Sequence, residues 1–132
     1  MVVSFPVEVA LSLDEDKAFS GAGTVYAYGI MDTGSTLSVT IDSTNAAYGK
    51  VKYCADAGSE GMDSGTNFFA TVTENLSKES FSAEETLNNY LAQKEAIDMP
   101  NFSNLAVSIK NLIPTSGTGI YYTNVPLKIA IQ

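Results

Sequence analysis

The chain has 132 residues and a net charge of −8, from seven Lys and fifteen acidic residues, and it contains no His, Trp or Arg. A chain this acidic repels polyanions, so we expect no nucleic-acid partner and no anionic membrane surface. Without His and Arg, the usual general base, the commonest metal ligand and the bidentate phosphate binder are all missing. We therefore expect neither a cofactor nor a metal.

The length fits a single domain, residues 1–132, which is large enough to bury a core without covalent cross-links. Cys54 is the single cysteine, so an internal disulfide is excluded. The opening residues carry Pro6 and Glu8 and have no basic region, so we interpret them as folded structure and not as a signal peptide.

The opening stretch alternates apolar and polar residues, which is the pattern of a half-buried strand. Its apolar set is Val3, Phe5, Val7, Val9, Leu11 and Leu13. Proline cannot donate a ladder hydrogen bond, so Pro6 predicts an edge strand or a bulge. This first strand is followed by a polar turn at 14–23.

Four further segments have strand character before residue 77. They are residues 24–31, 36–42, 48–55 and 68–76, and they are rich in β-branched and aromatic residues. A Gly-rich acidic loop at 56–67 separates the last two of them.

One segment breaks the strand pattern. Ser82 and Glu85 have the spacing of a capping box, and apolar residues follow at intervals of three to four. This predicts an α-helix at about 82–97, which ends before Pro100. We expect the helix to cross one end of the fold and to cap the core with Leu87 and Leu91. Strands at 105–113 and 120–131 complete the chain.

The resulting order is five strands, one helix and two strands. Short strands separated by turns favour a mainly β fold, a two-sheet antiparallel β-sandwich of the Ig-like or Greek-key type with the helix inserted before the last two strands. There is no alternation of strands and helices, which argues against a parallel α/β sheet.

The sharpest motif is Asp-Thr-Gly-Ser at 32–35. It matches the catalytic loop of aspartic proteases, in which two carboxylates activate a water, and one copy per chain would require a homodimer using Asp32. These four residue types are also the ones that a turn between two strands prefers, and we favour the turn.

Two clusters of acidic residues offer oxygen ligands for Ca²⁺. Asp14 and Asp16 form one, and Asp56, Glu60 and Asp63 form the other. Neither has the spacing of the twelve-residue calcium loop, so solvated acidic turns are the favoured interpretation.

Seven Tyr and six Phe residues raise the possibility of a glycan-binding surface, because sugars stack on aromatic faces. Tyr121 and Tyr122 are the candidates, since they follow an exposed turn. Tyr26 and Tyr28 are expected to lie half-buried on a sheet face.

Three stretches resemble short β-sandwich modules of Gram-positive gut-bacterial surface proteins and their phages. They are the opening strand and Gly-rich turn within 5–42, the Ser-Ala-Glu-Glu segment at 82–85, and the closing Gly-Tyr-apolar strand within 105–131. The resemblance implies non-catalytic roles in spacing, adhesion or particle decoration.

The chain begins and ends in strand-like sequence, and edge strands are templates for pairing with other chains. We therefore expect a structural subunit of a virion or of a bacterial cell-surface assembly that acts through contacts with protein subunits of the same or a neighbouring type. The alternatives are glycan binding through Tyr121 and Tyr122, and proteolysis through Asp32. Pro6 and Pro126 are expected to limit uncontrolled pairing of the two terminal strands.

Overall fold

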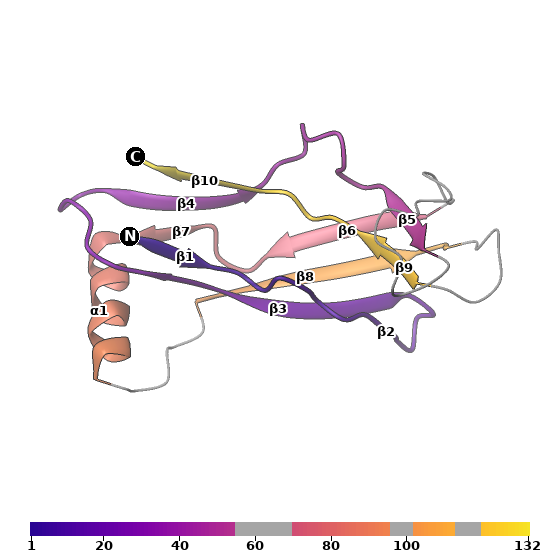
Figure 1. The fold of residues 1–132 in the computed structure, drawn as a ribbon, viewed down its shortest axis with the longest axis horizontal. Coiled ribbons are helices and arrows are strands. Elements are labelled where there is room, and N and C mark those ends of the chain that lie inside the picture. The colour runs from indigo at the N-terminus through magenta and orange to yellow at the C-terminus, as the bar shows by residue number, and fades with distance from the viewer. Residues whose placement is uncertain (55–69, 96–101, 113–119) are drawn as a thin grey trace.

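A computed structural model describes residues 1–54, 70–95, 102–112 and 120–132 (Figure 1). The described part is mainly β, its strands all pair antiparallel, and it contains a single short helix. The prediction of a mainly β, antiparallel fold with a single helix is therefore confirmed, but three strands follow the helix and not the expected two. The molecule is elongated, and the helix stands across one of its ends.

The largest sheet has five strands in the order β1-β3-β8-β6, with β2 also paired with β3. Its strands are β1 (Val2–Ser4), β2 (Ser12–Leu13), β3 (Phe19–Tyr28), β6 (Thr71–Leu76) and β8 (Ser103–Lys110). β8 alternates buried and less buried residues along its length, as one covered face requires.

Two smaller sheets complete the β structure. A three-stranded sheet has the order β10-β4-β7, and β5 pairs with β9 in a two-stranded sheet. Their strands are β4 (Thr36–Ile41), β5 (Val51–Cys54), β7 (Ser80–Ser82), β9 (Ile120–Thr123) and β10 (Leu127–Ile131).

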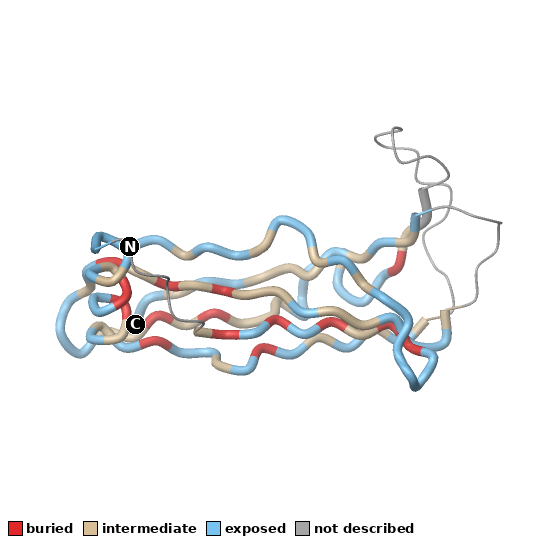
Figure 2. Tube along the Cα trace, turned by 90° about the horizontal axis from the view of Figure 1, so that it is seen from below, coloured by how far each residue is buried: buried red, intermediate tan, exposed pale blue. Residues whose placement is uncertain are grey.

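The two larger sheets share one hydrophobic core. Buried side chains of β3, β6 and β8 meet those of β4 and β7, and the largest is Phe81, which is fully buried. The other members of this cluster are Val25, Ala27, Leu37, Val39, Leu76, Leu105 and Val107. Figure 2 shows buried residues recurring along the strands between exposed ones. A second cluster forms around Val51 and Ile109.

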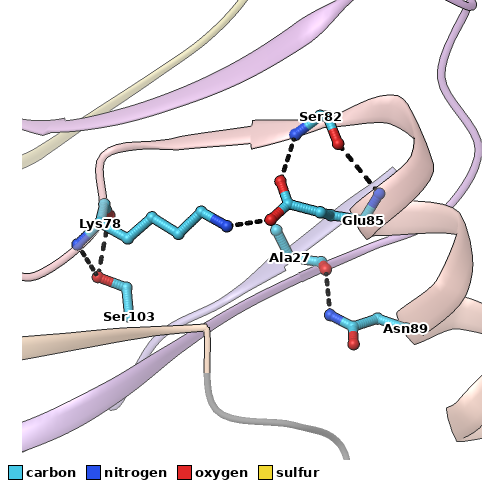
Figure 3. A network of polar contacts seen from close by, with 6 residues as sticks. All are labelled: Ala27, Lys78, Ser82, Glu85, Asn89 and Ser103. Atoms are coloured by element: carbon cyan, nitrogen blue, oxygen red, sulfur yellow. Dashed lines mark hydrogen bonds and ion pairs between the residues drawn. The ribbon is translucent and has the colours of Figure 1, made fainter.

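The chain passes from one sheet to the other at residues 77–79, between β6 and β7. Ser103 fixes this corner, because its Oγ donates to the carbonyl of Lys78 at 2.9 Å and accepts from the Lys78 amide at 3.2 Å (Figure 3). The Lys78 ammonium lies 5.5 Å from the ring centre of Phe81 and 5.7 Å from that of Phe102. It also pairs with Glu85. The two sheets are thus joined along this side by a continuous stretch of chain.

The helix α1 (Ala83–Lys94) begins as the capping box predicted. The Glu85 amide donates to Ser82 Oγ at 3.2 Å, and the Ser82 amide donates to the Glu85 carboxylate at 2.9 Å (Figure 3). The helix ends at Lys94, earlier than the expected 97, and residues 96–101 lie outside the described part.

The face that the helix turns toward the sheet is polar. Leu87 is 37% exposed and Leu91 is 46% exposed, so the expectation that they cap the core is wrong. Thr86 and Asn89 are buried in their place. The physical reason is close main-chain docking, because the Gly29 amide donates to the Thr86 carbonyl at 3.0 Å. The helix face at Thr86 and Asn89 therefore lies against the sheet, and Leu87 and Leu91 remain partly exposed.

The opening stretch is not the continuous strand that was predicted. Ser4 lies opposite Tyr26 and Ser12 opposite Ser20, so eight steps along the opening stretch face six along β3. Two surplus residues therefore leave the ladder between β1 and β2. Val7 is fully exposed as a result, and only Val3, Val9 and Leu11 of the predicted apolar set are partly buried.

The stretch between β1 and β2 lies over the core face of β3. A Cβ added to Gly21 would come within 2.4 Å of the Ala10 carbonyl oxygen, and one added to Gly23 within 2.5 Å of the Pro6 ring. These two positions must be glycine for the segment to approach so closely. Leu11 contacts both hydrophobic clusters and links them.

The closing stretch is also divided. The single strand predicted at 120–131 is interrupted at residues 124–126, and its halves have different partners. β9 pairs with β5, whereas β10 pairs with β4. The interruption allows the chain to move from one small sheet to the other.

Candidate functional site

The Asp-Thr-Gly-Ser motif forms a tight turn between β3 and β4. The Ser35 amide donates to the Asp32 carbonyl at 2.9 Å, and Gly34 has a φ of 87°. A positive φ at the third position of a turn is what type II geometry requires, and glycine supplies it. Asp32 is exposed on this turn. The structure therefore places the motif where the turn interpretation predicted.

The acidic residues before β3 also serve a turn. Asp14 Oδ1 accepts from the amides of Asp16 at 2.9 Å and Ala18 at 3.0 Å. These hydrogen bonds, chiefly the one from Ala18, lower the pKa of Asp14. The Asp14 carboxylate thus accepts its hydrogen bonds from main-chain amides of the same turn.

The second acidic cluster, Asp56, Glu60 and Asp63, lies outside the described residues. Within the described ranges no group of three or more Cys, Asp or Glu side chains is arranged to hold a metal ion.

Tyr121 and Tyr122 are consecutive residues of β9, opposite Tyr53 and Lys52 of β5. Consecutive strand residues point to opposite faces, so the two rings do not share a surface. Tyr121 packs against the cluster of Val51 and Ile109, whereas Tyr122 is 36% exposed. A glycan contact at this strand would therefore use the ring of Tyr122.

One titratable residue that the sequence analysis did not single out is Glu74 on β6. It lies opposite Val107 and between Val72 and Leu76, so it shares the inward face of its strand. Its Oε1 atom is buried without a hydrogen-bond partner, and burial raises the pKa of its carboxyl, while a hydrogen bond from Tyr48 opposes the rise. The sequence signal for this inward position is the alternation along β6, in which Val72, Glu74 and Leu76 share one face.

Hollows lie on the surface of the described part of the chain, among them one across β3, β6 and β8 and one beside the helix. The larger, of about 470 Å³, lies across β3, β6 and β8 and has a floor of small side chains from Ser20, Ala22, Thr73, Asn75, Ala106 and Ser108. The smaller, of about 240 Å³, lies beside the helix end of β3 and includes Val2, Tyr28 and Tyr90. Neither brings together side chains with an evident catalytic arrangement among the residues described.

The most distinctive surface is the outer edge of β10. β10 pairs with β4 on one side, and no strand in the described part of the chain pairs with its other side. Ile129 and Ile131 lie opposite the buried Val39 and Leu37 and so belong to the core face. They are nevertheless 44% and 56% exposed, whereas Val39 and Leu37 are 1% and 0% exposed. The core face of the sheet thus continues to an edge that nothing in the described residues covers.

Pro126 does not protect this edge. Its carbonyl accepts a hydrogen bond from the Asp42 amide at 2.8 Å, so residue 126 faces β4 and its missing N–H is on the inner side. Pro126 therefore removes no N–H group from the outer side of the closing strand, which was the strand whose pairing it was expected to limit.

No helix in the described residues is both long enough and apolar enough to cross a membrane. Comparison with protein-family models, with curated proteins and with solved structures finds no match to this chain.

Proposed function

We propose that this chain is a non-catalytic structural subunit that joins other protein subunits through its edge strands. The assembly is a phage virion, in its capsid or tail decoration, or a bacterial cell-surface structure. The observation that supports this proposal most is the free edge of β10 with the half-exposed core residues Ile129 and Ile131.

The physical argument concerns what an open edge does. A row of unpaired N–H and C=O groups is a template for another strand, and natural proteins usually protect such edges with proline, charge or a covering element. On β10 the proline faces inward, and the adjacent apolar side chains gain burial when a strand is added. Strand addition is a common mode of protein recognition.

Three acidic residues that the structure describes support a structural role. Asp14 and Asp32 belong to turns, and Glu85 holds the helix cap and the Lys78 ion pair. The carboxylates of Asp14 and Glu85 accept hydrogen bonds that hold the fold, and Asp32 closes its turn through its main-chain carbonyl.

The finer architecture belongs to the same proposal. We infer a two-sheet sandwich of the Ig-like or Greek-key type, with the five-stranded sheet as one layer and the two smaller sheets as the other. The shared core and the passage of the chain between layers at 77–79 support this arrangement. An experimental structure would test it through the connectivity of β5 and β9.

Particle association tests the assembly proposal. The purified chain is incubated with particles or cell walls of its source and with a matched acidic β protein as the control, and bound protein is measured after sedimentation. We expect specific association or formation of oligomers at micromolar concentration. A chain that stays monomeric and also binds neither particle nor wall would contradict the proposal.

A second candidate function is glycan binding, favoured by the exposed ring of Tyr122. Tyr122→Ala should then abolish binding on a glycan array, while Tyr121→Phe, which keeps the packed ring, should retain it. Binding that is absent from the unmodified chain would remove this candidate.

A further inference from the structure

The hydrogen bonds between β10 and β4 determine which residues of β10 have outward-facing backbone groups. Gln132 and Thr36 exchange both of their amide–carbonyl bonds, each at 2.9 Å. In an antiparallel ladder such pairs alternate along the strand, so residues 128 and 130 also direct their N–H and C=O groups toward β4. Residues 127, 129 and 131 direct theirs to the open side.

The three outward-directed residues are all large and apolar. Leu127, Ile129 and Ile131 lie opposite Ile41, Val39 and Leu37, so their side chains are on the core face while their backbone groups face the open edge. A strand added here would therefore satisfy the backbone and extend the core at the same time.

We propose that the added strand is β10 of a second copy of this chain, paired antiparallel about a two-fold axis at Ile129. This inference rests on the proposed assembly function and names its partner and surface. Ile129 then lies opposite Ile129 of the second copy, and Leu127 lies opposite Ile131 of that copy, in both directions. Each of these three pairs exchanges two backbone hydrogen bonds.

The sequence of β10 is self-complementary in this register. Apolar residues face apolar residues at every outward position, and Lys128 comes opposite Ala130, so no like charges lie directly opposite each other. β1 is less suited to this pairing, because it has three residues and is followed by Pro6. A two-fold contact of this kind closes on itself and gives a dimer.

Sedimentation velocity over a micromolar range tests the proposal at low and high salt. Each copy carries a net charge of −8, so dimerisation should strengthen with salt as the mutual repulsion is screened. Ile129→Lys brings two ammonium groups face to face and should weaken dimerisation by at least about tenfold. Lys128→Gln, on the opposite face of the same strand, is the control and should change it by less than about twofold.

Disulfide trapping gives a second readout that does not depend on affinity alone. In a Cys54→Ser background, Ile129→Cys should cross-link two copies, because directly paired residues lie about 5.5 Å apart between Cα atoms. Lys128→Cys is the control and should cross-link poorly, since residue 128 meets its counterpart only diagonally, at about 7–8 Å. Circular dichroism confirms that each variant is folded.

Three results would overturn the pairing. They are a wild-type chain that stays monomeric at both salt concentrations, a dimer that Ile129→Lys does not weaken, and cross-linking by the two cysteine variants with equal yield. A dimer that survives Ile129→Lys would leave the assembly function standing on another surface. Failure of the assembly function itself shows separately, in the particle and wall association measured with the wild-type chain.

Discussion

The side-chain amide of Asn89 donates a hydrogen bond from Nδ2 to the backbone carbonyl of Ala27, at 3.0 Å (Figure 3). Both residues are buried, and they are 62 positions apart in the sequence. β8 pairs with β3 only as far as Val25, so the helix provides the partner for a carbonyl beyond the end of that ladder. This contact fixes the helix to the five-stranded sheet.

Replacing Asn89 should therefore loosen the helix. Asn89→Leu leaves the buried Ala27 carbonyl without its partner and should lower the free energy of unfolding by about 1–3 kcal/mol. Urea denaturation measures the change. Asn88→Leu, at the exposed neighbouring position, is the matched control and should alter stability by less than about 0.5 kcal/mol. Equal effects of the two substitutions would show that the hydrogen bond does not hold the helix.

The close contact at Gly21 predicts a second destabilising substitution. The new methyl group of Gly21→Ala would meet the Ala10 carbonyl oxygen, so the segment between β1 and β2 must move away from the core. Overpacking of this kind should lower the free energy of unfolding by about 1–3 kcal/mol. Hydrogen exchange should speed up in residues 5–11. Ala22→Ser, on the exposed side of β3, should leave both quantities unchanged.

The Glu85 carboxylate predicts a loss of stability in acid. Its hydrogen bond with Lys78, supported by the Ser82 amide, lowers its pKa below the ordinary value of 4.5. A lowered pKa gives stability that is present above pH 4.5 and is lost as the pH falls through the folded-state value. The loss should be about 0.2–1 kcal/mol, because the pair is partly exposed. Thermal melts of Glu85→Gln across this range should lack that component of the acid loss.

Glu74 predicts the opposite pH dependence. Burial raises its pKa, so its ionised form destabilises the fold at neutral pH and this penalty disappears as the pH falls through the raised value. Glu74→Gln should raise Tm by a few degrees at neutral pH, and the gain should shrink toward pH 4.5, the ordinary value for glutamate. The exposed Glu79→Gln serves as the control. A gain that does not vary with pH would point to packing and not to charge.

The sequence predicted the elements whose signals are local. Ser82 and Glu85 predict the start of the helix from sequence alone, because both capping hydrogen bonds form between these two residues. The strand predicted at 36–42 is β4, whose buried Leu37 and Val39 follow the alternation of that one strand. These features need no knowledge of the partner strands.

Features that depend on distant partners could not be predicted. The sequence near Asn124 does not show that β9 and β10 pair with different strands, because the pairing depends on β5 and β4, which lie far away in the sequence. The apolar spacing of Leu87 and Leu91 indicated the wrong helix face, since the docking contact is made by main chain at Thr86. For the candidate interface, the sequence indicated that the closing strand is an edge. The side toward which Pro126 directs its backbone groups could be seen only from the hydrogen bonds between the closing strand and β4.

The segment between β1 and β2 is longer than the facing part of β3 by an even number of residues, two, so the side chains on both sides of it keep the same facing. Shortening the exposed segment by two residues, such as Val7 and Glu8, would bring its length into line with β3 and keep Val3 and Leu11 facing inward. Removing a single residue would exchange inward and outward side chains on one side of the deletion, so Val3 and Leu11 could no longer both face the core. Natural variation in length here is therefore expected in even steps.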